Sequence, residues 1–202
     1  MSGPVGVLLA GGRGARLGLG LPKALVALDG RTLLERAQAT LAIACEEVLV
    51  CAPRDVGELL GLEHFVADGI EHGGPLAGLV TGLAAARGRT VLALGVDLPF
   101  MRADTLARLA ELLGAHEAVV PAPHGRPQPL AAAYAPRAAD RLARALTGGE
   151  RRCVAAVLAL DARVLDADEV GQLPGGADAF FNLNTPADLA EAARRLAAEH
   201  AA

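Results

Sequence analysis

The stretch from Val5 to Lys23, which reads VGVLLAGGRGARLGLGLPK, constrains this chain more than any other part of the sequence. It begins with an apolar run, Val5 to Leu9, whose length suits a buried β-strand. The loop that follows contains five glycines between Gly11 and Gly20. Glycine allows sharp turns and a close backbone approach to a ligand, and successive backbone N–H groups form a concavity that binds anions. The stretch therefore predicts a strand followed by a loop that binds a polyphosphate.

Two common phosphate-binding loops do not describe this stretch. The dinucleotide pattern G-x-G-x-x-G can begin at Gly12 and Gly14, but its third glycine position is occupied by Leu17. The P-loop requires Gly-Lys-Ser/Thr, whereas Pro22 precedes Lys23 here. The missing third glycine argues against a dinucleotide-dependent oxidoreductase.

The loop also carries positive charge from Arg13, Arg16 and Lys23. The chain contains 19 lysine and arginine residues, and Lys23 is the only lysine among them. Because arginine is used everywhere else, a lone lysine in a glycine-rich loop indicates a task for a compact point charge. We interpret Lys23 and Arg16 as groups that neutralise the bound phosphates, in preference to chance surface residues.

The composition is that of one domain without features of a membrane or nucleic-acid-binding protein. At 202 residues the chain can bury a core, and because only 2% of it is aromatic, Ala, Leu and Val must fill that core. No apolar run approaches the ~20 residues of a membrane span, and the N-terminus lacks the basic start of a signal peptide. A net charge of −4 argues against a nucleic-acid surface. The three cysteines lack metal-ligand spacing, so we expect a reduced, cytoplasmic protein.

Apolar strands alternate with helical patterns along the chain, which predicts an α/β fold. Strands are expected at 5–9, 47–52, 64–67, 90–95, 118–121, 130–134 and 163–165, and helices at 33–44, 56–60, 76–86, 104–113, 137–146, 154–160 and 186–198. We expect a hairpin between the strands at 118–121 and 130–134, and a loop at 171–179. The predicted fold class is a Rossmann-like, three-layer α/β/α domain with a mostly parallel central sheet, a small β-hairpin and a C-terminal extension.

In such sheets the ligand binds beyond the carboxyl ends of the strands, where two aspartates are expected. Asp97 follows the strand at 90–95, and Mg²⁺ prefers one or two carboxylates together with phosphate oxygens and water. Asp68 opens a second glycine-rich loop, which leads through Gly74, Pro75 and Leu76 into a helix. A flat glycine backbone there can pack against a purine, and Asp68 can accept from the N–H groups of the base. A turn-forming role is the alternative for both aspartates.

Polar residues in the second half of the chain are candidates for contact with a second substrate. Asn184 precedes the last helix and can offer a carbonyl oxygen to a metal or phosphate, and Asn182 lies on the same side if this piece is extended. Arg126 and Gln128 lie in the expected hairpin, and Arg152 precedes a helix where a second anion can bind. We interpret these five as acceptor-binding residues, with ordinary surface and turn roles as the alternative.

With these residues identified, the chain resembles the molybdenum cofactor guanylyltransferases, within the broader nucleotide-diphospho-sugar transferase-like nucleotidyltransferases. The first loop is shared by all of these transferases, and the later motifs are more particular. The motifs that carry the resemblance are LLAGG…ARLG…PK at 8–23, GPLAG at 74–78, VDLPF at 96–100, RPQPL at 126–130, GERR at 149–152 and NLNTPADL at 182–189. They cover nearly the whole chain in the order that the family shows.

The resemblance implies a reaction and assigns roles. The implied reaction joins GMP from GTP to the terminal phosphate of molybdopterin, requires Mg²⁺ and releases pyrophosphate. The implied protein is a cytoplasmic enzyme that passes its product to molybdoenzymes. Its single domain, 1–202, would comprise a nucleotide-binding half at 1–115 and an acceptor-binding half at 116–202. By motif, Leu9, Ala10, Gly11 and Lys23 contact GTP, Asp68 lies on the guanine side, and Asp97 contacts GTP and Mg²⁺.

Two positions depart from the usual pattern of the family. Pro53 stands where an asparagine is usual, and Pro22 precedes Lys23 where an aspartate is usual. A proline supplies no side-chain hydrogen bond to a base, and Pro-Lys is more like relatives that use CTP or UTP. A nucleotidyltransferase that uses CTP or another triphosphate with a different phosphorylated acceptor therefore stays open. A nucleotide-binding regulatory protein without turnover is the other alternative, and the presence of both Lys23 and Asp97 argues against it.

Overall fold

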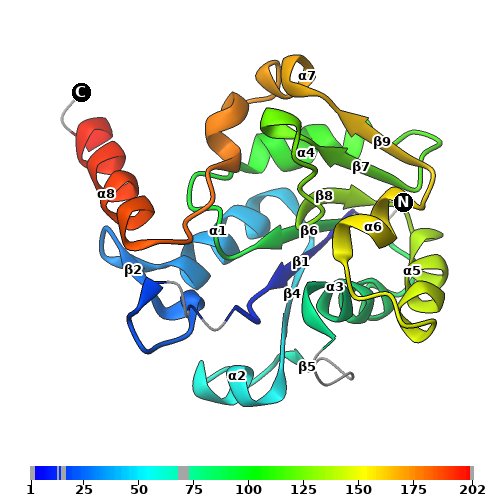
Figure 1. Cartoon of the computed structure of the whole chain (residues 1–202), viewed down its shortest axis with the longest axis horizontal. Helices are drawn as coiled ribbons and strands as arrows, with labels where there is room; N and C mark the ends of the chain where they lie inside the picture. The colour runs from blue at the N-terminus through cyan, green and yellow to red at the C-terminus, as the bar shows by residue number, and fades with distance from the viewer. Residues whose placement is uncertain (1–2, 13, 15–16, 68–72, 201–202) are drawn as a thin grey trace.

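The computed structural model describes residues 3–12, 14, 17–67 and 73–200, and among them a seven-stranded sheet forms the middle layer (Figure 1). The strand order is β5-β4-β1-β6-β8-β7-β9. The strands are β1 (Val5–Leu9), β4 (Glu47–Ala52), β5 (Val66–Ala67), β6 (Val91–Gly95), β7 (Ala118–Pro121), β8 (Ala131–Tyr134) and β9 (Ala162–Leu165). β8 runs antiparallel to β6 and β7, and every other pairing is parallel. The expectation of a mostly parallel sheet with a β7–β8 hairpin is confirmed.

Helices cover both faces of this sheet (Figure 1). They are α1 (Leu33–Ala44), α2 (Arg54–Leu59), α3 (Gly74–Ala85), α4 (Ala103–Glu111), α5 (Ala138–Thr147), α6 (Cys153–Leu158), α7 (Ala167–Gly171) and α8 (Pro186–His200). Successive side chains of β1 enter two separate cores, because residues alternate between the faces of a strand. Leu8 packs with α1 and α4 on one face, while Val7 and Leu9 pack with α3 and α5 on the other. No helix in the described part of the chain is long and apolar enough to cross a membrane.

A short hairpin and a helix cap connect the first loop to α1. A two-stranded hairpin joins β2 (Ala27–Leu28) to β3 (Arg31–Thr32) through Asp29 and Gly30. Both turn residues have positive φ, 54° and 73°, as the two-residue turns that suit β-hairpins require. Thr32 then begins α1 with a capping box, in which its hydroxyl accepts from Glu35 N and Glu35 accepts from Thr32 N. These contacts fix the chain directly after Lys23.

The region expected to be a loop, 171–179, is more ordered than predicted. It begins at the last residue of α7 and contains most of a 3₁₀ segment, Gly176–Phe180. Helix α7 begins with a second capping box, in which Asp166 accepts from the N–H groups of Asp168 and Glu169. The Asp-x-x-Glu pattern that produces it is of the same kind as the Thr-x-x-Glu pattern at the start of α1. The apolar run beyond it is short, and the prediction therefore missed the helix.

Candidate active site

The carboxyl ends of three neighbouring strands meet at one edge of the sheet. Leu9, the last residue of β1, pairs with Cys51 of β4 and with Gly95 of β6. Beyond this register, Ala10 N donates to Cys51 O at 2.9 Å and Val96 N donates to Leu9 O at 3.3 Å. The loops that follow β1 and β6 therefore start side by side, as the rule for open parallel sheets predicts.

The glycine-rich loop folds back so that Lys23 lies beside the start of the loop. Lys23 N donates to Gly12 O at 3.0 Å, and Leu17 N donates to Gly14 O at 2.9 Å. Gly14 has φ +64°, and a Cβ there would lie 2.8 Å from Leu21 O, so only glycine fits without strain. The described loop thus uses some of its own N–H groups internally and buries most of the Lys23 side chain.

The ammonium group of Lys23 joins three segments that are far apart in the sequence. Its Nζ donates to Asn184 Oδ1 at 2.7 Å and lies 3.3 Å from Asp97 Oδ2. Asp97 stands just beyond β6 and is partly exposed, with 27% of its side-chain surface accessible. A Cβ on Gly95 would lie 2.6 Å from Asp97 Oδ1, so the carboxylate occupies space that a larger residue at position 95 would fill. The structure thus brings together the two groups that the sequence placed at this edge, and adds Asn184.

The backbone of the segment that carries Asn184 is held on both sides of this residue. Leu183 N donates to Asp97 O at 2.9 Å, which ties this segment to the tip of β6. On the other side, Asp188 Oδ2 accepts from Asn184 N at 2.8 Å and from Thr185 N at 2.7 Å. Thr185 Oγ1 accepts in return from Asp188 N at 3.2 Å, which completes a capping pattern at the start of α8.

Asp188 is a positioning residue that the sequence interpretation missed, although it stands three residues after Thr185 in a Thr-x-x-Asp pattern. Hydrogen bonds from the N–H group of Asn184, and then from Thr185, hold the pKa of the Asp188 carboxyl below its usual value. The ionised form of Asp188 is therefore the one that the folded state favours.

We expect the Asp188→Ala variant to lose about 1 kcal/mol of unfolding free energy at pH 7, the usual effect of removing a helix cap. Because the folded-state pKa is lowered, this contribution is fully present above the unfolded pKa of about 4 and declines as the pH falls through the folded-state pKa. Denaturant unfolding of both proteins between pH 7 and pH 3 measures the difference. Asp161→Ala, which removes an exposed carboxylate elsewhere, is the control. A constant difference across this range would contradict the role given to the ionised carboxylate.

The remaining nucleotide-binding candidates differ in their exposure. Leu9, Ala10 and Leu76 are buried, and the side chain of Leu76 packs into the core on the α3 side of the sheet. Gly74 and Pro75 are exposed at the start of α3. Gly11 is partly exposed, Gly12 is exposed, and a Cβ on Gly11 would lie 3.0 Å from the ring of Pro53. Arg13, Arg16 and Asp68 lie outside the described residues.

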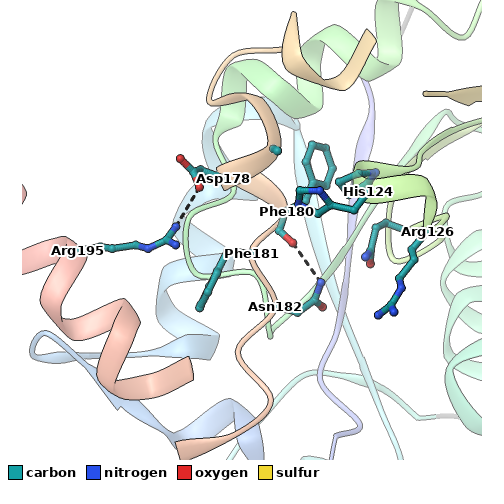
Figure 2. A pocket seen from close by; sticks show the side chains of 10 residues that line it. His124, Arg126, Asp178, Phe180, Phe181, Asn182 and Arg195 are labelled. Atoms are coloured by element: carbon teal, nitrogen blue, oxygen red, sulfur yellow. Dashed lines mark hydrogen bonds and ion pairs between the residues drawn. The ribbon is translucent and has the colours of Figure 1, made fainter. Parts of the chain in front are cut away.

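The acceptor-binding candidates do not form one group. Arg126, Gln128 and Asn182 line a cavity of about 470 Å³ between the β7–β8 connection and the segment before α8 (Figure 2). Asn184 lies beside Lys23 and is not among the residues that line this cavity. Arg152 is exposed and lies beside Glu150, with Nε 3.3 Å from Oε1, outside the cavity lining.

Other residues that line the cavity were not selected from the sequence. They are Pro123, His124, Ala177, Asp178, Phe180, Phe181 and Arg195. They come from segments separated by more than 50 positions, and no local pattern marks them as neighbours. The adjacent phenylalanines were the available signal, because the whole chain has only four.

The side-chain oxygens of Asp97 and Asn184 beside Lys23 suit a hard divalent cation that binds together with phosphates. In the described ranges there is no group of three or more His, Cys, Asp or Glu residues that could hold a metal by itself. The Asp97 carboxylate and the Asn184 Oδ1 atom are hard oxygen donors that approach the same ammonium group. Such a partial set suits Mg²⁺, which usually keeps several waters and binds through one or two carboxylates and substrate phosphates.

Residues 6–164 match the family model described as the MobA-like NTP transferase domain. The chain belongs to this family. A molybdenum cofactor guanylyltransferase of Acidiphilium cryptum is 42% identical over 198 residues, which cover 93% of this chain and 94% of the relative. The resemblance inferred from the motifs is thereby confirmed, and with it the expectation that this MobA-like chain is a nucleotidyltransferase.

Solved structures of related proteins share the fold. The molybdopterin-guanine dinucleotide biosynthesis protein A of Archaeoglobus fulgidus superposes with a TM-score of 0.81 at 27% identity, over 96% of this chain and 98% of that one. Rv0371c of Mycobacterium tuberculosis, solved in complex with manganese, superposes with a TM-score of 0.68 at 18% identity, over 96% of this chain and 98% of that one. The expected fold class of this MobA-like transferase is therefore confirmed.

Proposed function

We propose that this MobA-like transferase joins GMP from GTP to the terminal phosphate of molybdopterin and releases pyrophosphate. The observation that carries the proposal is the meeting of Lys23, Asp97 and Asn184 at the carboxyl edge of the sheet. The name of the Acidiphilium relative supports the choice of substrates, because that relative matches along nearly its whole length.

The reaction needs charge neutralisation more than it needs a general base. An attacking phosphate monoester is largely dianionic at pH 7, because its second pKa is about 6. The barrier comes from repulsion between anions and from the charge that develops on the leaving pyrophosphate. Lys23 is suited to offset this charge, because its ammonium group is mostly buried and electrostatic interactions are stronger away from bulk water.

Asp97 and Asn184 would hold Mg²⁺ against the triphosphate. The ion, when bound, would neutralise part of the charge on the phosphates. In the structure the ammonium of Lys23 lies between the oxygens of Asp97 and Asn184, and its flexible four-carbon stem lets it turn toward a phosphate. The mycobacterial protein of the same fold was solved in complex with manganese, which supports the use of a divalent cation.

Recognition of guanine would depend on residues around the start of α3 and on Asp68. Gly74 and Pro75 present exposed backbone there. Pro53, which stands where the family usually has an asparagine, lies against Gly11 at the start of the first loop. Because proline has no side-chain donor or acceptor, its position can supply only shape to the base pocket.

A panel of the four nucleoside triphosphates tests this function. With molybdopterin and Mg²⁺, we expect GTP to give pyrophosphate and the guanine dinucleotide at least about 10-fold faster than ATP, CTP or UTP, a discrimination of about 1.4 kcal/mol. Faster reaction with CTP would contradict guanine transfer and support the cytidylyl alternative. Binding of GTP without Mg²⁺-dependent pyrophosphate release would contradict enzymatic function and support a regulatory protein.

A further inference from the structure

The two oxygens assigned to the metal are already in contact with a protein cation. Lys23 Nζ lies 2.7 Å from Asn184 Oδ1 and 3.3 Å from Asp97 Oδ2. A magnesium ion held by the same two oxygens would lie about 2.1 Å from each of them. The ion would therefore take nearly the position that the ammonium group holds, and two cations at one position repel each other strongly.

Burial of Lys23 makes this repulsion effective. Only 11% of the side-chain surface of Lys23 is accessible, against 27% for Asp97. Repulsion between charges is weakly screened in such a place, because little water and salt lie between them. A free divalent cation that approaches from solvent therefore reaches Asp97 only by expelling the ammonium group that is paired with it.

The first loop offers the ammonium group a second position only when that loop holds phosphate. Lys23 N donates to Gly12 O at 3.0 Å, so the side chain begins beside the exposed backbone of this loop. Its four-carbon stem is flexible enough to turn Nζ from Asp97 toward this backbone. In the described part of the chain, Nζ bonds to Asp97 and Asn184 alone. If it left them without meeting a phosphate, a mostly buried charge would lose its partners, which is costly.

The backbone positions of Asp97 and Asn184 do not depend on Lys23. Leu183 N donates to Asp97 O at 2.9 Å, which joins the two segments through the main chain. Asp188 Oδ2 accepts from Asn184 N at 2.8 Å on the other side. Because neither bond involves Lys23, movement of the ammonium group leaves two oxygen donors in place for a cation.

We infer that Lys23 closes the metal site to free divalent cations and opens it when a triphosphate binds. The ammonium group takes the place of the metal in the nucleotide-free protein and turns to the phosphates when they arrive, so that the cation enters together with the nucleotide. This inference rests on the proposed function for the assignment of Asp97 and Asn184 to the metal.

Binding of Mn²⁺ without nucleotide tests the inference. Mn²⁺ takes the same kinds of oxygen ligand as Mg²⁺, and the electron paramagnetic resonance signal of the free ion measures how much is bound. We expect the wild type and Asp97→Asn to bind Mn²⁺ equally weakly. Lys23→Met, which keeps a long side chain without its charge, should bind Mn²⁺ at least about 10-fold more tightly than the wild type. Adding Asp97→Asn to this variant should abolish the gain.

Two further variants control for charge, and thermal unfolding shows whether each variant is folded. Lys23→Arg keeps a cation beside Asp97 and should bind Mn²⁺ as weakly as the wild type. Lys23→Met combined with Asp161→Asn, which alters an exposed carboxylate elsewhere, should keep the gain. A folded Lys23→Met protein that binds Mn²⁺ no better than the wild type would overturn the inference. So would nucleotide-free binding of Mn²⁺ to the wild type that Asp97→Asn abolishes.

A nucleotide analogue provides the second measurement. We expect α,β-methylene-GTP to tighten Mn²⁺ binding to the wild type at least about 10-fold, and Mn²⁺ to tighten binding of the analogue by the same factor. The increase should be smaller in Lys23→Met, whose metal site is open with or without the analogue. Water-proton relaxation distinguishes Mn²⁺ on the protein from Mn²⁺ on free analogue. An equal increase in both proteins would overturn the inference.

The outcomes separate this inference from the proposed function. If Lys23→Met gains a Mn²⁺ site that depends on Asp97 but the wild type forms no guanine dinucleotide, the function fails and the inference stands. If product forms and Lys23→Met gains no such site, the inference fails alone. If no protein binds Mn²⁺ through Asp97, with or without the analogue, the metal assignment fails and the inference fails with it.

Discussion

Replacing Lys23 with alanine is expected to lower kcat/KM for GTP on the order of 10²-fold or more, comparable to the loss of a preorganised charge or donor in other active sites. The reason is geometric and electrostatic. The mostly buried ammonium group lies within reach of both Asp97 and Asn184, where a triphosphate would bring further negative charge. The variant removes the Lys23 cation, so the charge of Asp97 and of the phosphates is less well neutralised at this point.

Lys23→Arg is the matched variant, because it keeps the charge and changes its shape. A Cβ on Gly12 would lie 3.7 Å from the Cβ of Lys23, so the loop packs closely against this side chain. We expect Lys23→Arg to remain at least about 10-fold below the wild type, since a planar guanidinium cannot reproduce a compact ammonium. Thermal unfolding of both variants shows whether the fold is kept. A folded Lys23→Ala protein with near-normal kcat/KM would remove Lys23 from the mechanism.

The Asp97→Asn variant is expected to lower turnover on the order of 10²-fold and to raise the Mg²⁺ concentration needed for half-maximal rate. Asparagine keeps the size of the side chain, and Leu183 still bonds to the main chain of residue 97. Only the carboxylate charge is lost, so the fold should be unaffected. The measurement is a Mg²⁺ titration of pyrophosphate release at saturating GTP.

The two substitutions give different signatures. Lys23→Ala should leave the Mg²⁺ midpoint close to that of the wild type, whereas Asp97→Asn should shift it at least about 10-fold upward. Asp161→Asn, which alters an exposed carboxylate beside His116, is the control for a general effect of charge. Near-normal turnover and an unshifted midpoint in Asp97→Asn would refute the metal assignment.

The parts of the fold that local chemistry determines could be predicted from the sequence. The bounds of β1, α1 and β4 agree with expectation, because an apolar run of strand length and a capping box are local signals. Asp29-Gly30 is likewise a local turn signal, and the structure forms the β2–β3 hairpin there. Helix α7 was missed at 167–171, since its signal is a capping box with little apolar periodicity behind it.

The candidate site could be predicted only in part. Lys23 and Asp97 meet because strands that run parallel bring their carboxyl ends to one edge, which is a property of topology. Asn184 was placed near a metal or phosphate, but Asp188, which holds it, was overlooked. The roles of Arg16 and Asp68 stay predictions, because both lie outside the described residues.

The cavity shows why the acceptor side was harder to predict. Arg126 was selected from the expected hairpin and Asn182 from the extended piece before the last helix. Their association with Phe181 and Arg195 depends on how α8 packs beside the sheet. Nothing in the local sequence specifies that packing. Arg152, selected because it precedes a helix where an anion can bind, lies outside the cavity and pairs with Glu150 in its own turn. Local reasoning cannot separate two such arginines.

Because Lys23 is the only lysine, one measurement tests the central claim directly. In protein labelled with ¹³C at lysine Cε, the side-chain signal reports on Lys23 alone. The account predicts that α,β-methylene-GTP with Mg²⁺ shifts this signal in the wild type, and that Asp97→Asn needs a much higher Mg²⁺ concentration for the same shift. A signal that stays in place when the analogue saturates the wild-type protein would contradict a shared triphosphate site at Lys23 and Asp97.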